Sequence, residues 1–205
     1  MTAPSYHIDG DILPGAARPL TEFLGKNPGP VTLFINSPGG SAPEGAALQA
    51  AIEAHGAVTV RVRGVAASAA TLPMVAAQRA LIHPAAMVMI HEPSALSEGT
   101  AARHREAAGA LDKITETYAR AYARHTGHPV ETILEWMRAE TWLTAEEAVA
   151  LRFADALDEA TEAPPMAARA DYTRFRAAPE SLRLLTAQNG WTAVPSDPPK
   201  EQANA

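Results

Sequence analysis

The sequence contains no cysteine, which excludes disulfide bonds, thiolate catalysis and cysteine-ligated zinc. Lysine is almost as rare. The chain has only Lys26, Lys113 and Lys200, which lie in a loop-like stretch, a predicted long helix and the C-terminal tail, so a serine–lysine catalytic pair is disfavoured. Basic residues form no cluster and the net charge is −6, so we expect neither a nucleic acid nor an anionic membrane as a partner.

Long apolar segments are also missing. The longest charge-free run of small or apolar residues, 65–77, is too short and too rich in alanine to span a bilayer. The N-terminus has no basic segment followed by an apolar run, so it does not resemble a signal peptide. No two histidines have H-E-x-x-H or similar metal spacing. We therefore expect a soluble, cytoplasmic protein with no metal site and no cofactor.

The bulk composition suits one medium-sized globular domain. The chain has 205 residues, of which 47% are hydrophobic and 20% are charged. Apolar periodicity is dense up to residue 160, whereas 161–205 contains six prolines and ends in a polar run. These patterns predict a folded domain over 1–160 and a tail over 161–205 that is mostly extended or disordered, with a short helix around 180–185.

Apolar and β-branched segments alternate with alanine-rich ones. The predicted strands are VTLFIN (31–36), AVTVRV (57–62), RALIH (79–83) and AMVMI (86–90). The predicted helices between them span 43–54 and 68–77, an alternation typical of parallel strands in an α/β domain. From residue 100 onward the chain is predicted to be mostly helical: a long helix over 100–125, a second after Pro129, and a third that begins at Thr144 with a capping box.

Two turns could carry chemistry. In INSPGG (35–40), consecutive glycines allow positive φ, and their N–H groups would suit an oxyanion or a phosphate, although a plain strand-to-helix turn is the simpler interpretation. The phosphate-loop motif is absent. Ser68 follows a predicted strand and a turn at Gly64, and it opens a helix. By position alone it is an N-cap or packing residue, and a nucleophile at the positive helix end is the alternative.

A serine nucleophile needs a base and an acid. His91 differs from the other histidines because it ends a predicted strand, and in open α/β sheets ligands gather at the carboxyl ends of strands. Ser68 and His91 are thus predicted to face one crevice, the alternative being a hydrogen-bonded histidine at the edge of the core. Sequence spacing does not choose among the candidate acids Glu140, Asp155, Asp158, Asp112 and Glu116. The residues alone indicate a serine hydrolase and go no further.

Five blocks in fixed order resemble the ClpP serine peptidases, within the wider ClpP/crotonase fold, over about residues 8–160: INSPGG, GVAASAA, MVMIHEP, HTGHPVETI and TWLTAEEAVAL. The resemblance implies an α/β fold, a spiral of ββα units with the 100–125 helix projecting as a handle. It implies Ser68 as the nucleophile and His91 as the general base. The oxyanion hole would be the backbone N–H groups of Gly40 and Ala69. Glu140 stands at the position of the family's catalytic aspartate.

The resemblance also implies partners. Family members form rings, usually of seven subunits, stacked face to face, so we expect a ring-forming homo-oligomer that cleaves proteins or peptides. The chain departs from the family in lacking the segment before IDGDI that helps to dock an unfoldase ATPase. It also has Glu140 for aspartate, 93–96 in place of a supporting glycine pair, and Arg152 where a glycine usually ends the last helix.

Together with the tail segment ADYTRFRAAPESL, the missing front segment and the glutamate look more like ClpP-like proteins of phages and prophages, which are associated with head maturation. We therefore expect an ATPase-independent endopeptidase that acts on capsid or scaffold proteins in the bacterial host cytoplasm.

Two other interpretations stay open at this point. One is a catalytically weak ClpP-like shell or assembly protein. The other is a crotonase-type acyl-CoA enzyme, whose pocket needs carboxylates rather than a serine–histidine pair. In each case the apolar face from Ala107 to Tyr122 is predicted to pack against neighbouring subunits rather than to take part in chemistry.

Overall fold

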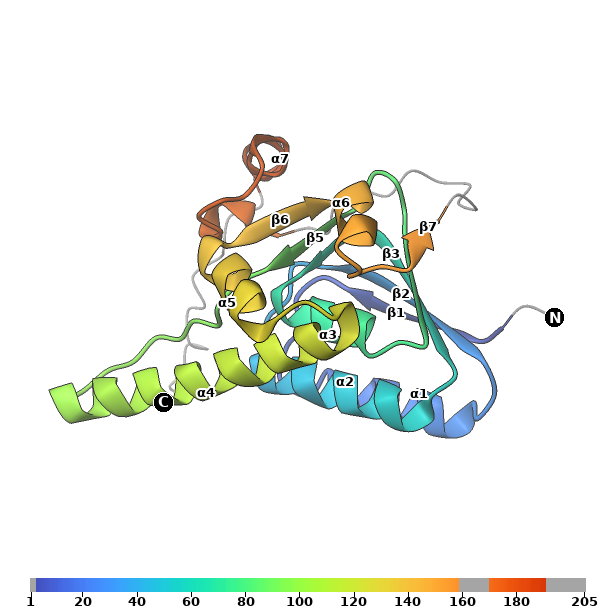
Figure 1. The fold of residues 1–205 in the computed structure, drawn as a ribbon, viewed down its shortest axis with the longest axis horizontal. Helices are drawn as coiled ribbons and strands as arrows, with labels where there is room; N and C mark the ends of the chain where they lie inside the picture. The colour runs from blue at the N-terminus through green and yellow to red at the C-terminus, as the bar shows by residue number, and fades with distance from the viewer. Residues whose placement is uncertain (1–2, 159–169, 191–205) are drawn as a thin grey trace, which may run out of the picture.

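A seven-stranded sheet forms the centre of the computed structural model, which describes residues 3–158 and 170–190 (Figure 1). The strands are β1 (Ser5–Asp9), β2 (Val31–Ser37), β3 (Val58–Ala67), β4 (Arg79–Ile82), β5 (Met87–Ile90), β6 (Thr141–Thr144) and β7 (Ala156–Leu157). The main path runs β1-β2-β3-β4-β7, and β5 and β6 branch from it. All pairs are parallel except the antiparallel pair β5–β6.

Strand β3 is long enough to pair with two neighbours in turn. Its first half, 59–62, pairs with β4, and its second half, 65–67, pairs with β5. The sequence predicted a strand that ended at residue 62 followed by a turn at Gly64. That prediction is wrong, because Gly64 lies inside β3. The extra length carries β3 beyond β4 and delivers Ser68 to the same edge at which β2 and β5 end.

Helices cover both faces of the sheet. Figure 1 shows α1, α2 and α3 on one face and α7 on the other, while α4 projects beyond the sheet at its N-terminal end. The helices are α1 (Ala17–Lys26), α2 (Ala42–His55), α3 (Thr71–Val75), α4 (Ala101–Thr126), α5 (Val130–Ala139), α6 (Ala145–Ala150) and α7 (Glu180–Asn189). Two 3₁₀ turns complete the set, η1 (Ser68–Ala70) and η2 (Tyr172–Arg174). No helix in the described part of the chain is long and apolar enough to cross a membrane.

Most of the predicted elements are confirmed. The four predicted strands correspond to β2, β3, β4 and β5, and the long helix over 100–125 is α4. The capping box at Thr144 is present in both directions: its side chain accepts from the Glu147 N–H and its own N–H donates to the Glu147 carboxylate. The elements β1, α1, β6 and β7 were not predicted from the sequence.

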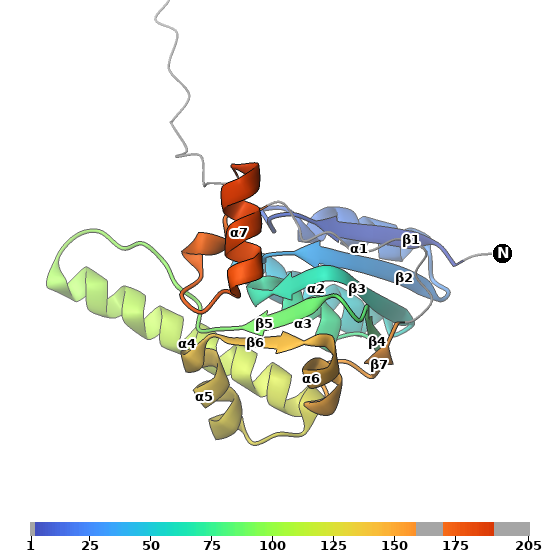
Figure 2. The same ribbon diagram turned by 90° about the horizontal axis from the view of Figure 1, so that it is seen from above.

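The described C-terminal residues 170–190 are folded, which differs from the mostly extended or disordered tail that the sequence predicted. They form η2 and α7, so the helix expected around 180–185 is present and longer. Their apolar side chains pack against β3 and β5 in a second core, which consists of Val65, Ala67 and Met89 from these strands and of Ala170, Tyr172, Phe175, Ala178 and Leu182. Figure 2 shows α7 near the carboxyl ends of β2 and β3. Residues 161–169 and 191–205 lie outside the described residues, and the division at residue 160 stays a prediction.

Candidate active site

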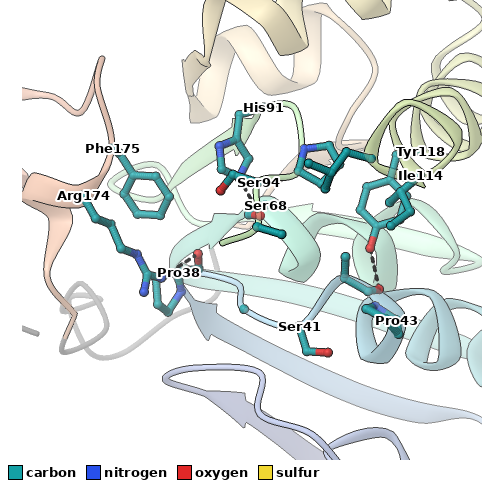
Figure 3. Close-up of a pocket in the computed structure, with 15 residues that line it drawn as sticks. Pro38, Ser41, Pro43, Ser68, His91, Ser94, Ile114, Tyr118, Arg174 and Phe175 are labelled. Atoms are coloured by element: carbon teal, nitrogen blue, oxygen red, sulfur yellow. Dashed lines mark hydrogen bonds between the residues drawn. The ribbon is translucent and has the colours of Figure 1, made fainter. Parts of the chain in front are cut away.

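Three parallel strands end at one cavity. β2 leads into the turn at Pro38–Gly40, β3 into Ser68, and β5 into His91, and all of these residues except Gly39 line a cavity of about 450 Å³. Carboxyl ends of parallel strands share an edge, which is why residues far apart in sequence meet there. Figure 3 shows Ser68 and His91 between two walls, with Ile114 and Tyr118 on one side and Arg174 and Phe175 on the other.

Ser68 is held in a strained conformation at the start of a helical turn. Its φ is 54°, in the left-handed region that side-chain-bearing residues rarely adopt, at a cost of about 1–3 kcal/mol. The Thr71 hydroxyl donates to the Ser68 carbonyl oxygen at 2.6 Å, and it lies 2.6 Å from the buried Tyr122 hydroxyl. Burial raises the pKa of Tyr122, so this phenol stays protonated and can donate to Thr71. These contacts fix the backbone so that the Ser68 side chain faces the cavity.

The Ser68 hydroxyl lies within hydrogen-bond distance of His91. The distance between Oγ and Nε2 is 2.8 Å, as a nucleophile and its general base require. Burial lowers the pKa of His91; the charge of Glu140 partly offsets this effect, and that of Arg174 adds to it. The imidazole is therefore neutral near pH 7 and, with its proton on Nδ1, can accept the Ser68 proton at Nε2.

The two glycines of the PGG turn have no room for a side chain. A Cβ on Gly39 (φ 89°) would lie 2.5 Å from the Ala67 carbonyl oxygen, and one on Gly40 (φ 149°) 2.3 Å from the Ile12 carbonyl oxygen. The Gly39 position would also approach the Ala69 nitrogen to 3.0 Å. The turn thus lies directly against the residues around Ser68, an arrangement suited to placing backbone N–H groups beside a reacting carbonyl.

Glu140 lies near His91 but does not bond to it. It ends α5 with a φ of 56°, and its carboxylate accepts hydrogen bonds from the backbone N–H groups of Arg176 at 3.0 Å and Ala177 at 2.6 Å. The Trp142 indole adds a long contact of 3.5 Å. Within the described residues, no hydrogen bond joins Glu140 to His91, so Glu140 acts on the imidazole through its charge.

The other candidate acids are engaged elsewhere. Asp155 accepts a hydrogen bond from the Ala80 N–H, and Asp158 pairs with Arg61 at 3.2 Å. Asp112 and Glu116 line a separate hollow beside α4 and α5. Among the candidates named from the sequence, Glu140 is the acid whose charge acts on His91. No cluster of three or more potential metal ligands occurs in residues 3–158 and 170–190.

Neither wall of the cavity was predicted from the sequence. Leu111, Ile114 and Tyr118 of α4 line one wall, although their face was predicted to pack between subunits. Tyr118 also donates to the Ala42 carbonyl oxygen at 2.6 Å, which ties α4 to the start of α2. Arg174 and Phe175 form the other wall and come from the predicted tail. The aromatic and basic residues of DYTRFR (171–176) were the one feature of this proline- and alanine-rich segment that could have indicated a folded wall.

Comparison with known proteins supports the family resemblance seen in the sequence. A family model described as Clp protease matches residues 23–160. The chain belongs to the Clp protease family. It is 33% identical over 119 residues to an ATP-dependent Clp protease proteolytic subunit of Pleurastrum terricola, covering 57% of this chain and 61% of that one. It is 34% identical over 129 residues to proteolytic subunit 2 of Thermobifida fusca, covering 61% and 63%.

A solved structure of a Clp family member supports the fold assignment. A ClpP1 mutant from Listeria monocytogenes superposes with a TM-score of 0.70 and 25% identity, covering 76% of this chain and 91% of that one. The ClpP-like α/β fold that the resemblance implied is thereby confirmed. The sequence matches span less than two thirds of the length of the curated relatives described above.

Proposed function

We propose that this Clp family member is a serine endopeptidase that cleaves peptide bonds through Ser68 and His91. The observation that supports this most is the 2.8 Å contact between Ser68 Oγ and His91 Nε2, with Ser68 held in a strained conformation next to the PGG turn. A serine that served only as a helix cap would need neither the positive φ nor a histidine on its hydroxyl. A strongly bent strand-to-helix turn that exposes the hydroxyl suits a nucleophile.

The proposed reaction follows from these positions. Ser68 Oγ attacks the scissile carbonyl carbon while His91 Nε2 takes its proton, and the N–H groups of Gly40 and Ala69 bind the oxyanion. The imidazolium then gives its proton to the leaving amine. Water, deprotonated by His91, releases the acyl group from Ser68. The Glu140 charge favours the imidazolium at each stage, through its field rather than through a hydrogen bond.

The cavity suggests how a peptide binds. Its α4 wall is apolar apart from the Tyr118 hydroxyl, which is already bonded to a backbone carbonyl, so this wall fits an apolar side chain. The opposite wall carries the Arg174 guanidinium. Such a cavity accommodates an extended peptide with an apolar residue on one side of Ser68 and polar groups on the other, where Arg174 already pairs with Asp11 at 3.4 Å.

Two further parts of the proposal concern the substrate and the assembly. We propose a ring-forming homo-oligomer that works without an ATPase on capsid or scaffold proteins of a phage or prophage. The support is the glutamate at the acid position and a C-terminal segment folded against the active site. Co-expression with a candidate capsid or scaffold protein, with no unfoldase present, tests this: cleavage that requires Ser68 supports it, and an absolute requirement for an unfoldase contradicts it.

A catalytically weak shell protein is the second candidate, and one observation favours it. The Glu140 carboxylate is bonded to backbone N–H groups rather than to His91. A crotonase-type enzyme has less support, because the cavity presents a serine–histidine pair. A fluorophosphonate probe separates peptidase from shell: an activated Ser68 forms a covalent adduct that Ser68→Ala abolishes, and an assembled wild type that stays unlabelled points to the shell protein.

A further inference from the structure

The C-terminal segment lies beside the proposed catalytic residues. We call residues 174–178 the strap. It begins at the last residue of η2 and precedes α7, and its residues Arg174 and Phe175 line the cavity wall opposite α4 (Figure 3). The matched family region ends at residue 160, so the strap lies outside the part of the chain that defines the family.

The strap supplies the strongest hydrogen bonds to the candidate acid. The N–H groups of Arg176 and Ala177 donate to the two carboxylate oxygens of Glu140, one to each, at 3.0 and 2.6 Å. Backbone N–H donors to a carboxylate are charge-assisted and hold it in one orientation. The strap therefore decides where the negative charge beside His91 is located.

The strap also braces the candidate base. The Phe175 ring meets the His91 imidazole edge-on, with centroids 5.7 Å apart and an interplanar angle of 70°. Trp142 also packs against the Phe175 ring in a T-shaped arrangement, with the ring centroids 5.7 Å apart. Phe175 is only 4% exposed, so its position is fixed by packing. Among the described residues no acid hydrogen-bonds to the imidazole, so packing against Phe175 restrains rotation of the ring in addition to the Ser68 hydrogen bond.

The strap is anchored at both ends and is not a loose tail. The Arg176 guanidinium donates to the Arg138 carbonyl oxygen at 2.8 Å at the end of α5. Arg183 of α7 donates to the carbonyl oxygens of Phe175, at 3.4 Å, and of Arg176. Beneath these bonds, the second core packs Tyr172, Phe175 and Leu182 on β3 and β5.

We propose that the strap is a working part of the active site, in which Phe175 positions the His91 ring and the Arg176 and Ala177 N–H groups position the Glu140 charge. The proposal rests on the proposed peptidase function and deepens it. The strap residues are positioning groups, because they act through His91 and Glu140 and not on the substrate. Misplacing a reacting group by about 1 Å can cost on the order of 100-fold in rate, so we expect losses of about 10- to 100-fold when the strap is disturbed.

The test uses full-length variants and the fluorophosphonate probe. Ala177→Pro removes the shorter of the two N–H bonds to Glu140, whereas Ala177→Gly keeps it and controls for the loss of the methyl group. The saturating labelling rate of Ala177→Pro is expected to fall about 10- to 100-fold, with the probe's half-saturation concentration changed less than about threefold. Ala177→Gly retains this N–H and should therefore label faster than Ala177→Pro. A change confined to folding would instead lower the labelled fraction without changing the rate.

The pH dependence adds a readout that a purely structural strap would not affect. The Glu140 charge raises the His91 pKa. In Ala177→Pro the carboxylate is held less firmly beside the imidazole, so the His91 pKa should fall and the acidic limb of the labelling profile should move to lower pH. Phe175→Leu is a second variant, which keeps apolar volume in the second core but removes the ring edge. It should lower the labelling rate and leave the limb where it is in wild type.

Two results would overturn the proposal while leaving the peptidase function intact. If Ser68-dependent labelling of both Ala177→Pro and Phe175→Leu equals that of wild type, the strap does not position the site. If either variant labels faster than wild type, the strap restrains the site instead. Absence of Ser68-dependent labelling in wild type itself would refute the proposed function, and the strap proposal with it.

Discussion

Replacing Gly45 by alanine should damage the proposed oxyanion hole from the neighbouring helix. Gly45 is buried in the first turn of α2, where its backbone is an ordinary helix, so alanine causes no φ strain. However, the added Cβ would lie 2.9 Å from both the Cβ and the carbonyl oxygen of Ala69. Helix propensity favours alanine by about 1 kcal/mol, while overpacking of this kind costs about 1–3 kcal/mol. The net change in stability should be between zero and a loss of about 2 kcal/mol.

The loss of activity should be larger than the loss of stability. The overlap is relieved by moving Ala69 a few tenths of an ångström, and Ala69 carries one of the two N–H groups proposed to bind the oxyanion. Complete loss of such a donor costs about 3–4 kcal/mol of transition-state stabilisation, or about 100- to 1,000-fold in rate. A partial displacement should therefore slow peptide hydrolysis by about 10- to 100-fold.

Gly25→Ala is the matched control. Gly25 lies in the last turn of α1, and a Cβ there would meet nothing within 4 Å. It should be neutral or stabilise the protein by up to about 1 kcal/mol, with activity unchanged. Thermal unfolding gives the stability and a fluorogenic peptide gives the rate. If Gly45→Ala matches Gly25→Ala in both measurements, the steric argument is refuted, and with it the role of Ala69.

Further predictions concern charge. The substitution Glu140→Gln removes a charge that raises the His91 pKa, so the acidic limb of the pH–rate profile should move to lower pH. Arg174→Gln should move it to higher pH, because that cation lowers the pKa, and shifts of the same sign would contradict this electrostatic account. Arg61→Leu removes the ion pair between Arg61 and the buried Asp158 carboxylate and should cost roughly 3 kcal/mol in chemical unfolding, while the folded fraction keeps its Ser68 reactivity.

The sequence predicts the fold well where one local pattern decides the structure. β-branched runs identify β2, β4 and β5, and helical periodicity identifies α4 almost to the residue. It fails at β6 and β7, which have four and two residues and exist through pairing with β5 and β4. It also fails at Gly64, where a residue typical of turns lies inside a strand because β3 continues past it to pair with β5 over 65–67.

The candidate site was likewise predictable from the sequence only in part. Ser68 and His91 follow strands, and the sheet brings them together as expected. The resemblance pointed to Glu140, but its hydrogen-bond donors could not be foreseen. They are backbone N–H groups 36 and 37 residues further along the chain. Every residue except proline has such a group, so a pattern of side chains cannot identify it. The position of Phe175 was not predicted either, because the proline- and alanine-rich composition of this segment indicates a tail. In the structure, the few apolar residues of 170–182 are enough to form a small second core with β3 and β5.

The central claim is that Ser68 cleaves peptide bonds with His91 as its base. The most direct measurement is mass spectrometry of the peptides released from an unstructured protein such as casein, incubated with purified oligomer and no nucleotide. Ser68→Ala and His91→Ala serve as controls. The account predicts defined internal cleavage products from the wild type and none from either variant. Equal products from Ser68→Ala, or none from an assembled wild type that hydrolyses no peptide substrate, would contradict it.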